Sequence, residues 1–572
     1  MMTYWDSRKM ENIIRSLYDD GIEYIEETVR EMSLYARQIF FVNCMKIIDK
    51  SYYDYVMLKS DESAKFFFEI LRYAYPVLIK YLWTKDFESI VAMPLAHADA
   101  NEIYRCRVFL CSCKVVGQTG YALDMEKYGY VSIDSKNNTC IIKYLHNNWW
   151  VEYSEAKCTD FNENLIYSLI QLDDRVKTLQ AQWPMIQEEM RPLCFVWLKE
   201  FMGYTSTANI EKYFGDTAYY DAIHSTEWNY FSEQSKFDGI AYGSFISAII
   251  DLSGYAAKHI HFAGLLQSSH PELIAENLFY NIKMEDDIIQ LIQENRRCSK
   301  KQAQVILSSV SISSDNNELY NLGQVSCAPL VKISRNQYLQ SVAGSLFHPF
   351  SFLLSSLQQK FPNDFSRNIN NRESMFREEL YETVGAEFTC IDHNIVVKYD
   401  GKVVTDIDAA IVDKNNGEIA LFQLKWQNQT VDSIRSLHSK ALNYEKETIY
   451  WVESVERWLE QTSKADIAGH LGSGIKEKDI DKSKIFLFVL GRNHGHYSGT
   501  QLKGEKVVWV QWFQLLQYFL MMKMMQEKFT IKDLYDVLPK NAPANENVKR
   551  EPQEYSIGPY TIVVEGTDNE ND

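Results

Sequence analysis

The sequence lacks an excess of positive charge. Its 572 residues include 59 Lys and Arg against 77 Asp and Glu, so the formal net charge is −18. A protein that coats nucleic acid through its overall charge needs the opposite balance, so that class is excluded. The acidity is unevenly spread, because residues 367–523 hold 20 Lys and Arg against 22 Asp and Glu. This nearly neutral segment can still contact nucleic acid locally.

A disulfide framework is also missing. The ten cysteines, from Cys44 to Cys390, have no regular spacing and include no CxxC pair of the kind that binds zinc. Cys106, Cys111 and Cys113 come nearest to a cluster, and the last two fall in an apolar run at 108–113 that we interpret as a strand. We expect free, buried thiols.

Export and membrane signals are absent from the pattern as well. The most hydrophobic long stretch, residues 239–266, is interrupted by Asp251, Lys258, His259 and His261, which excludes an ordinary membrane span. The first residues, Met-Met-Thr-Tyr-Trp-Asp, have no basic region followed by an apolar core, so we expect no secretory signal. We therefore predict a cytoplasmic protein without a membrane partner.

The composition is otherwise that of a folded protein, with 46% hydrophobic and 24% charged residues. Local patterns predict a mixed α+β chain, in which a large, mostly α-helical N-terminal region with a small β-rich insertion precedes an α/β domain with a central mixed sheet. A hairpin is expected around Ser135–Asn138. The expected segments are a helical region at 1–100, a β-rich segment at 101–158, a helical domain at 159–365, the α/β domain at 366–535 and a flexible acidic tail at 536–572.

The order of elements is most informative between residues 365 and 515. The sequence predicts a helix that begins at residues 371–376, runs to Val384 and ends at Gly385. Strands are predicted at 394–399, 403–412 and 419–426, separated by turn sequences. A long helix is expected at 431–461, followed by strands at 485–490 and 507–510.

Two of these strands carry polar residues where a buried strand should be apolar. Asp406 and Asp408 lie two residues apart, so they share a face of their strand, and Gln423, Lys425 and Gln427 do the same on the next one. If the strands pair as a hairpin, burying these groups requires a compensating ion or a substrate. Carboxylate and amide oxygens suit Mg²⁺ or Mn²⁺.

The simpler alternative is a hairpin whose polar face meets solvent. Phe422, Leu424 and Trp426 occupy the opposite face of the last strand, so that strand has a defined buried side and a defined polar side. This separation of the two faces weakens the simpler alternative without excluding it.

The preceding helix supplies a further acid. Phe376, Leu380 and Val384 mark its apolar face at helical spacing, and Glu373 falls within that face. We therefore expect Glu373 to be the helix carboxylate that reaches the site. The alternative is that Glu373 is an exposed acid in the first turn, where it would stabilise the helix dipole.

Asp408 is followed, after fourteen residues, by Gln423-Leu424-Lys425, and a Glu-bearing helix and a hairpin precede this string. The arrangement resembles the PD-(D/E)xK nuclease superfamily, in the Mrr-like D…QxK variant in which Gln replaces the second acid. The resemblance is confined to residues 370–515, and its short motif gains specificity from the strand-turn-strand context. Ile407 replaces the proline that gives the family its name.

The resemblance implies a restriction-endonuclease-like domain and a Mg²⁺- or Mn²⁺-dependent nuclease. In that family Asp408 would be the main metal ligand, Gln423 and Glu373 would complete the ligand set, and Lys425 would orient or activate the attacking water. A supporting or substrate-binding role is expected for Asp406, Gln427, Arg377 and Arg435.

The implied function is an endonuclease that hydrolyses phosphodiester bonds in DNA, with RNA as an alternative substrate, in a restriction or phage-defence setting. The N-terminal region would recognise substrate, regulate activity, or bind a partner protein or a second copy. Two other hypotheses remain open: a nuclease-fold protein that binds nucleic acid or protein without cutting, and a regulatory subunit whose function lies in residues 1–360.

Overall fold

The computed structural model describes residues 12–92, 95–145, 174–223, 230–321, 326–385, 388–399, 401–427, 433–472, 474–497, 500, 502, 507–538 and 552–565. The chain divides into two compact units. Unit 1 comprises Met1–Asp124, Ile166–Asn368 and Thr430–Ser433, and unit 2 comprises Met125–Leu165, Ile369–Gln429 and Ile434–Asp572. Both helices and strands are present, so the expected mixed α+β class is confirmed. None of the helices in these ranges is long and apolar enough to cross a membrane.

Unit 1 is mostly helical. Its helices are α1 (Ile13–Arg30), α2 (Leu34–Leu58), α3 (Asp61–Glu69), α4 (Tyr75–Leu82), α5 (Ala100–Lys127), α7 (Asp174–Met190), α8 (Ala208–Ile223), α9 (Tyr242–Ser269), α10 (Glu285–Arg296), α11 (Lys300–Ser309), α12 (Val342–Leu346), α13 (Pro349–Lys360) and α14 (Pro362–Ile369), and its strands are β3 (Cys194–Trp197), β4 (Phe201–Tyr204), β5 (Lys236–Phe237), β6 (Ile240–Ala241), β7 (Ile282–Met284), β8 (Ser311–Ile312), β9 (Leu330–Lys332) and β10 (Gln337–Gln340).

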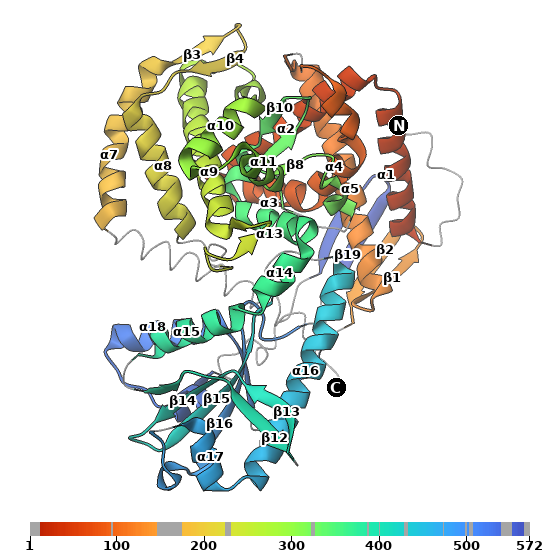
Figure 1. Ribbon diagram of the computed structural model, residues 1–572. Helices are drawn as coiled ribbons and strands as arrows, with labels where there is room; N and C mark the ends of the chain where they lie inside the picture. The colour runs from red at the N-terminus through yellow and green to blue at the C-terminus, as the bar shows by residue number, and fades with distance from the viewer. Residues whose placement is uncertain are drawn as a thin grey trace. The chain divides into compact units, whose positions relative to one another are not determined.

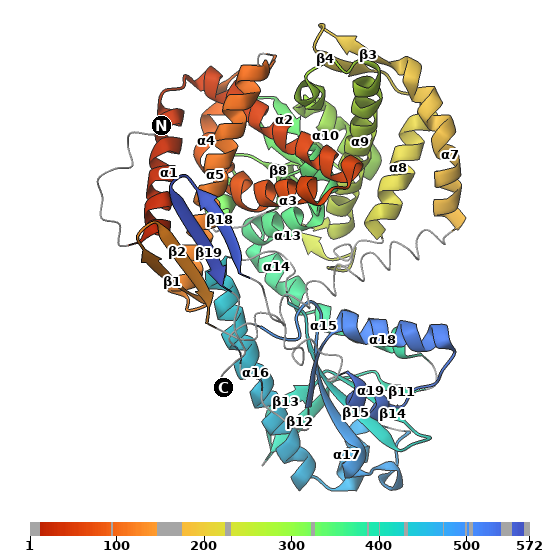
Figure 2. The ribbon, with the colours of Figure 1, turned by 180° about the vertical axis from the view of Figure 1, so that it is seen from behind.

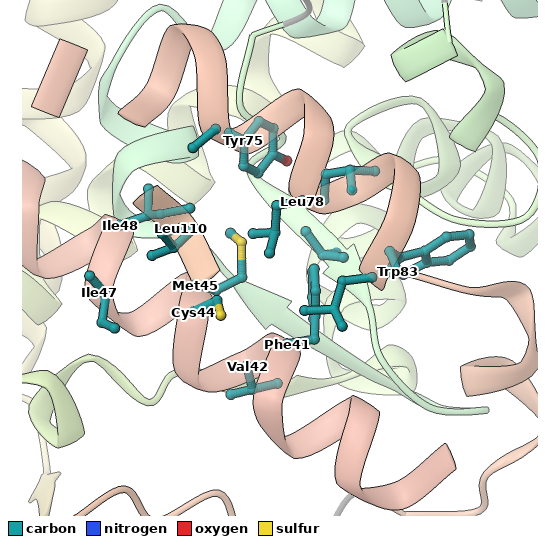
Figure 3. Packing of buried hydrophobic residues seen from close by; sticks show 14 of the residues in the cluster. Phe41, Val42, Cys44, Met45, Ile47, Ile48, Tyr75, Leu78, Trp83 and Leu110 are labelled. Carbon is teal, nitrogen blue, oxygen red and sulfur yellow. The ribbon is translucent and has the colours of Figure 1, made fainter. Parts of the chain in front are cut away.

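The core of unit 1 surrounds α2. Phe41, Met45 and Ile48 of this helix pack with Leu78 of α4 and Leu110 of α5 (Figure 3). Four short strands form a sheet in the order β7-β10-β9-β8. Unit 1 therefore holds a large apolar core of its own, as the composition predicts.

The helix α5 corrects one prediction. Residues 100–127 are one continuous helix, so the strand at 108–113 is wrong, and the β-rich segment expected at 101–158 is wrong over this part. Cys106, Phe109, Cys113 and Val116 are its buried positions, at the spacing of three and four residues that marks a helix. The nine described cysteines are free, as expected, although Cys111 is exposed. Residues 146–158 lie outside the described residues.

Unit 2 holds two sheets and a separate hairpin. Its elements are β1 (Val131–Lys136), β2 (Thr139–Tyr144), α15 (Arg372–Val384), β11 (Thr389–Ile391), β12 (Ile395–Tyr399), β13 (Lys402–Ile407), β14 (Ala409–Asp413), β15 (Glu418–Lys425), α16 (Ile434–Gln461), α17 (Lys464–Leu471), β16 (Ile485–Gly491), β17 (Val507–Gln511), α18 (Trp512–Met525), α19 (Ile531–Val537), β18 (Gln553–Ile557) and β19 (Tyr560–Glu565). The β1–β2 pair confirms the hairpin expected around Ser135–Asn138.

The central sheet of unit 2 is mixed, in the order β11-β14-β15-β16-β17. The first three strands pair antiparallel, whereas β16 runs parallel to both β15 and β17. The parallel step from β15 to β16 requires a crossover, which α16 and α17 supply. These two helices pack on one face of the sheet, and α15, α18 and α19 pack on the other (Figures 1 and 2).

The strand predicted at 403–412 is divided at Asp408. Its first part, β13, pairs with β12 in a separate two-stranded sheet, and its second part, β14, pairs with β15 in the central sheet. An apolar run at 409–412 follows the alternating residues at 405–408 without an intervening Gly or Pro, so the sequence predicts a single strand across the change of partner. The break places Asp408 where the chain passes from one sheet to the other.

The C-terminal segment corrects another prediction. Residues 553–565, expected to belong to a flexible tail, form the hairpin β18–β19. The strand β19 pairs in parallel with β2, which gives a four-stranded sheet in the order β1-β2-β19-β18. The mainly apolar residues 560–564 form most of this strand. The Asn-, Pro- and Glu-rich composition of the neighbouring residues led to the prediction of a flexible tail. Residues 539–551 and 566–572 lie outside the described residues.

Candidate active site

Asp408 is a buried carboxylate at the start of β14. Its backbone N–H donates to the carbonyl oxygen of Phe422 at 3.0 Å, and its side chain is turned to β15. Asp408 Oδ2 accepts a hydrogen bond from the backbone N–H of Leu424 at 2.7 Å and another from the side-chain amide of Gln423. With the residue only 2% exposed, these donors fix the orientation of the carboxylate.

The strand β15 separates polar from apolar residues as predicted. Phe422 and Leu424 pack with the α15 and α18 side of the core, whereas Leu421 packs with the α16 side. Because side chains alternate, Gln423 and Lys425 follow Leu421 on the α16 side, at the end of the strand. Gln423 is 8% exposed. The hairpin that pairs β14 with β15 therefore brings Gln423 against Asp408, as the sequence predicts.

Lys425 makes an ion pair that the sequence does not reveal. Its Nζ lies 2.8 Å from Oε2 of Glu447 on α16. Glu447 is separated from Lys425 by 22 positions and by a change of secondary structure, so strand periodicity cannot link the two. Glu447 is one of several exposed acids on α16, and the helix pattern alone does not select it as the partner of Lys425.

Glu373 lies in the first turn of α15, and the three residues expected to mark the apolar face of that helix are buried. Burial raises the pKa of Glu373 above its usual value, and the positive charge of Lys425 opposes part of this increase. Asp406 raises it further. Glu373 is an exposed residue of the first turn, as in the alternative interpretation, and it also lies within electrostatic reach of Lys425 and Asp406, as the expected role requires.

The carboxylates also influence one another through Asp408. Burial raises the pKa of Asp408 to about 7, with Glu373 and Asp406 contributing in the same direction. The Leu424 N–H and the Lys425 ammonium act against this increase. Negative charge thus gathers at the end of β15, where a proton or a cation would relieve the repulsion.

Two of the predicted supporting residues, Asp406 and Arg377, take part in hydrogen bonds beside Asp408. Asn394 donates from Nδ2 to Oδ2 of Asp406 at 3.0 Å. Arg377 donates from Nη1 to the backbone oxygen of Asp408 at 3.0 Å and to the side-chain oxygen of Asn394. Trp451 Nε1 donates to the backbone oxygen of Asp406 at 2.7 Å. Arg377 therefore holds the bend at Asp408 in place.

The other two predicted supporting residues are placed differently. Both polar side-chain atoms of Gln427 are buried and have no hydrogen-bond partner among the described residues. Its backbone oxygen accepts from Asn493 Nδ2 at 2.7 Å, so the residue is anchored through its main chain. Arg435 is an exposed residue at the beginning of α16. The described contacts join neither side chain to Asp408.

Arg492 is a buried cation beside the site that the sequence analysis did not select. Its backbone N–H donates to the oxygen of Lys425 at 2.7 Å, directly after β16. Its guanidinium donates to Oε2 of Glu379 at 2.6 Å and lies 5.0 Å from the ring centre of Trp426. The sequence feature that could have identified Arg492 is a charged residue immediately after an apolar strand. Arg492 therefore links the end of β16 to α15 through Glu379 and to the end of β15 through the Lys425 backbone.

The donor set suits a hard divalent cation. Asp408, Glu373 and the side-chain oxygen of Gln423 are oxygen donors, and the clustering of negative charge is what such an ion would offset. In the described part of the chain no group of three or more His, Cys, Asp or Glu side chains is arranged to hold a metal. A Mg²⁺ ion commonly uses one or two carboxylates and keeps several waters, so the finding does not decide whether the expected ion binds here.

Comparison with known proteins adds no assignment to this geometry. No family model, no curated protein and no solved structure matches the chain.

Proposed function

We propose that this protein is a metal-dependent endonuclease that hydrolyses phosphodiester bonds, with DNA as its expected substrate. The observation that supports this function is the meeting of Asp408, Gln423 and Lys425 at the end of β15, with Glu373 in electrostatic reach. Asp408 and Gln423 are both buried there, at 2% and 8% exposure. The central mixed sheet of unit 2, with α15 before it and α16 as its crossover, supports a restriction-endonuclease-like domain.

The residues of the site have complementary chemical roles. A divalent cation bound by Asp408, Glu373 and the oxygen of Gln423 would neutralise the phosphodiester and lower the pKa of the attacking water. The Lys425 ammonium would stabilise the negative charge that develops on the phosphoryl oxygens. Arg377, bonded to the backbone oxygen of Asp408, would keep the bend rigid during the reaction. A cytoplasmic restriction or phage-defence role rests on the family resemblance.

The test is a cleavage assay of the full chain with DNA and RNA in Mg²⁺ or Mn²⁺. We expect cutting that EDTA abolishes, and we expect Asp408→Ala and Lys425→Ala each to lose at least about 100-fold in rate. Arg457→Ala is the matched control, because Arg457 is an exposed residue of α16 for which no role in the site is expected. Undiminished cutting by both site variants would overturn the proposal.

A second candidate is a nuclease-fold protein that binds nucleic acid without cutting it. The observation that favours it is the pairing within the site: the Gln423 amide donates to Asp408, and Lys425 is paired with Glu447. In this arrangement the Gln423 side chain presents a donor, rather than its oxygen, to the carboxylate. Titration calorimetry with Mn²⁺ separates the two functions. A nuclease should show a heat of Mn²⁺ binding that depends on Asp408. A protein that only binds nucleic acid should keep its nucleic-acid affinity and show no such heat.

A further inference from the structure

A small polar pocket lies where β15 begins, at the opposite end of this strand from Lys425. Its volume is about 280 Å³, and it is lined by residues 412–417 together with Lys478, Asp479, Asp481 and Lys484. Apart from Val412 and Gly417, these residues carry polar or charged side chains. Pockets for drug-sized ligands usually hold about 300–1,000 Å³ and are mostly apolar. The pocket therefore suits a compact, polar ligand.

The parallel pairing of β15 and β16 places the two walls of the pocket side by side. Residues 412–417 lead into β15 through a turn, and residues 478–484 come directly before β16. Ile419 is paired with Ile485, so both strands begin at the same edge of the central sheet. At about 3.3 Å per residue, the length of β15 separates this edge from Lys425 by about 23 Å. The pocket is therefore separate from the candidate active site.

The three acids of the pocket already accept hydrogen bonds from backbone N–H groups. Asp413, which is 5% exposed, is engaged through both of its oxygens, because Oδ2 also accepts from the side-chain amide of Asn416 at 2.7 Å. The backbone bonds are those of Asp413 Oδ1 with Asn415 at 2.8 Å, Asp479 Oδ2 with Lys476 at 2.9 Å, and Asp481 Oδ1 with Ser483 at 3.1 Å. Each carboxylate is thus held by its own turn of the chain.

The lysines of the pocket keep hydrogen-bond donors that are not engaged in this way. Lys484 Nζ donates to the backbone oxygen of Asn416 at 2.8 Å, which uses one of its three hydrogens. Within the described part of the chain, Lys414 and Lys478 form neither a hydrogen bond nor an ion pair. Residues 476–484 hold four lysines and three acids, although the whole chain has a net charge of −18. Ammonium donors therefore exceed the free acceptors at the pocket.

We propose that this pocket binds the phosphate group of a small molecule through Lys414, Lys478 and Lys484. A phosphate presents three oxygens and a negative charge to three ammonium groups, whereas a carboxylate presents two oxygens. Lysine binds phosphate as a point charge, and such charge-assisted hydrogen bonds are stronger than neutral ones. The inference goes beyond the proposed nuclease function and does not depend on it, because the pocket is separate from the candidate active site.

The test is titration calorimetry of the full chain with pyrophosphate, and separately with inorganic phosphate, in metal-free buffer at physiological ionic strength. We expect one pyrophosphate per chain with a Kd below about 1 mM. Lys414→Gln and Lys478→Gln should each weaken binding at least about tenfold, the loss of one charge-assisted hydrogen bond. Lys478→Arg should keep most of the affinity, because the positive charge is retained.

Lys476→Gln is the matched control for these variants. It removes the same charge from an exposed position of the same segment, outside the lining of the pocket. Salt screens charges that make no direct contact, so binding should change less than about twofold. Acetylation of lysines by an activated ester, followed by mass spectrometry, locates the anion directly. Pyrophosphate should protect Lys414 and Lys478 from the reagent and leave Lys476 reactive.

Three outcomes would overturn the phosphate site. The first is a Kd above about 1 mM for both anions. The second is unchanged binding in both Lys414→Gln and Lys478→Gln. The third is loss of binding in Lys425→Met with both pocket variants unaffected, which would place the anion at the candidate active site. None of these results bears on whether the protein cuts DNA, so the two proposals stand or fall separately.

Discussion

Lys425 Nζ lies 2.8 Å from Glu447 Oε2, and this ion pair joins the end of β15 to α16. The Lys425 side chain is 21% exposed and that of Glu447 is 61% exposed. An ion pair so open to solvent contributes little to folding stability. The pair therefore holds the ammonium at the candidate active site without being needed for the fold, and function and stability can be separated experimentally.

Lys425→Met should abolish cutting while leaving the fold intact. Methionine keeps most of the aliphatic length but removes the charge, so we expect a loss of at least about 100-fold in cleavage rate. The free energy of unfolding, from urea curves, should change by less than about 1 kcal/mol. Glu447→Gln is the control that breaks the same pair, and it should cost far less in rate. An equal loss of rate in both variants would show that the pair, rather than the ammonium, matters.

Tyr381 of α15 forms hydrogen bonds to two paired strands of the central sheet, β11 and β14. Its hydroxyl donates to the backbone oxygen of Ile391 in β11 at 2.6 Å and accepts from the backbone N–H of Ala410 in β14 at 3.1 Å. Tyr381→Phe leaves both backbone groups without this partner, so we expect a loss of about 1–3 kcal/mol in the free energy of unfolding.

The control for this substitution is Tyr450→Phe. Tyr450 is 54% exposed, and its hydroxyl donates to the backbone oxygen of Val404 at 3.3 Å. Water can replace that bond, so urea unfolding should show a change below about 0.5 kcal/mol. If both variants lost the same stability, the buried position of the Tyr381 hydroxyl would have no special effect.

Local sequence pattern predicts the central elements of unit 2 well. The helix ending at Gly385, the hairpin before Lys425 and the two parallel strands all have clear periodicity and turn residues, and each is present. Asp408 and Gln423 were identifiable because a polar pair in an apolar strand contradicts simple burial. Their contact follows directly from pairing the two strands.

Other features depend on contacts between distant residues. The division of the strand at Asp408 arises because β13 and β14 pair with different partners, which a single strand pattern cannot show. Glu447 meets Lys425 only after the crossover helix folds back on the sheet. In α5 the β-branched and aromatic content outweighed the helical spacing of Cys106, Phe109 and Cys113 in our interpretation.

His259 should make unit 1 sensitive to acid. Its Nε2 lies 3.0 Å from the backbone oxygen of Leu278, and its Nδ1 lies 3.3 Å from the hydroxyl of Tyr204. Burial, with a contribution from Lys283, lowers the pKa of His259 from 6.5 to about 3. The unfolded chain therefore takes up the proton first, so the stabilising contribution is complete above pH 6.5 and is lost as the pH falls toward 3.

The comparison with a variant isolates this histidine from other titrating groups. Between pH 6.5 and about 5 the wild type should lose about 2 kcal/mol more unfolding free energy than His259→Gln. His270→Gln is the control, because His270 is exposed beside Glu272, and it should follow the wild type. Urea unfolding at the two pH values measures the difference. Parallel losses in the wild type and His259→Gln would contradict the assignment.

The C-terminal hairpin should protect β2 from exchange with solvent. The strand β19 pairs with β2 from Thr561 to Glu565, and the N–H of Thr561 donates to the backbone oxygen of Asn138 at 2.8 Å. Ile562, 6% exposed, is one of its buried anchors. Ile562→Asp buries a charge in this sheet, so we expect β19 to detach and the amides of residues 139–144 to exchange faster in deuterium labelling. Ser556→Asp adds the same carboxylate at an exposed position of β18 and should leave exchange unchanged. Equal protection of residues 139–144 in the two variants would mean that β19 does not cover the edge of β2 in solution.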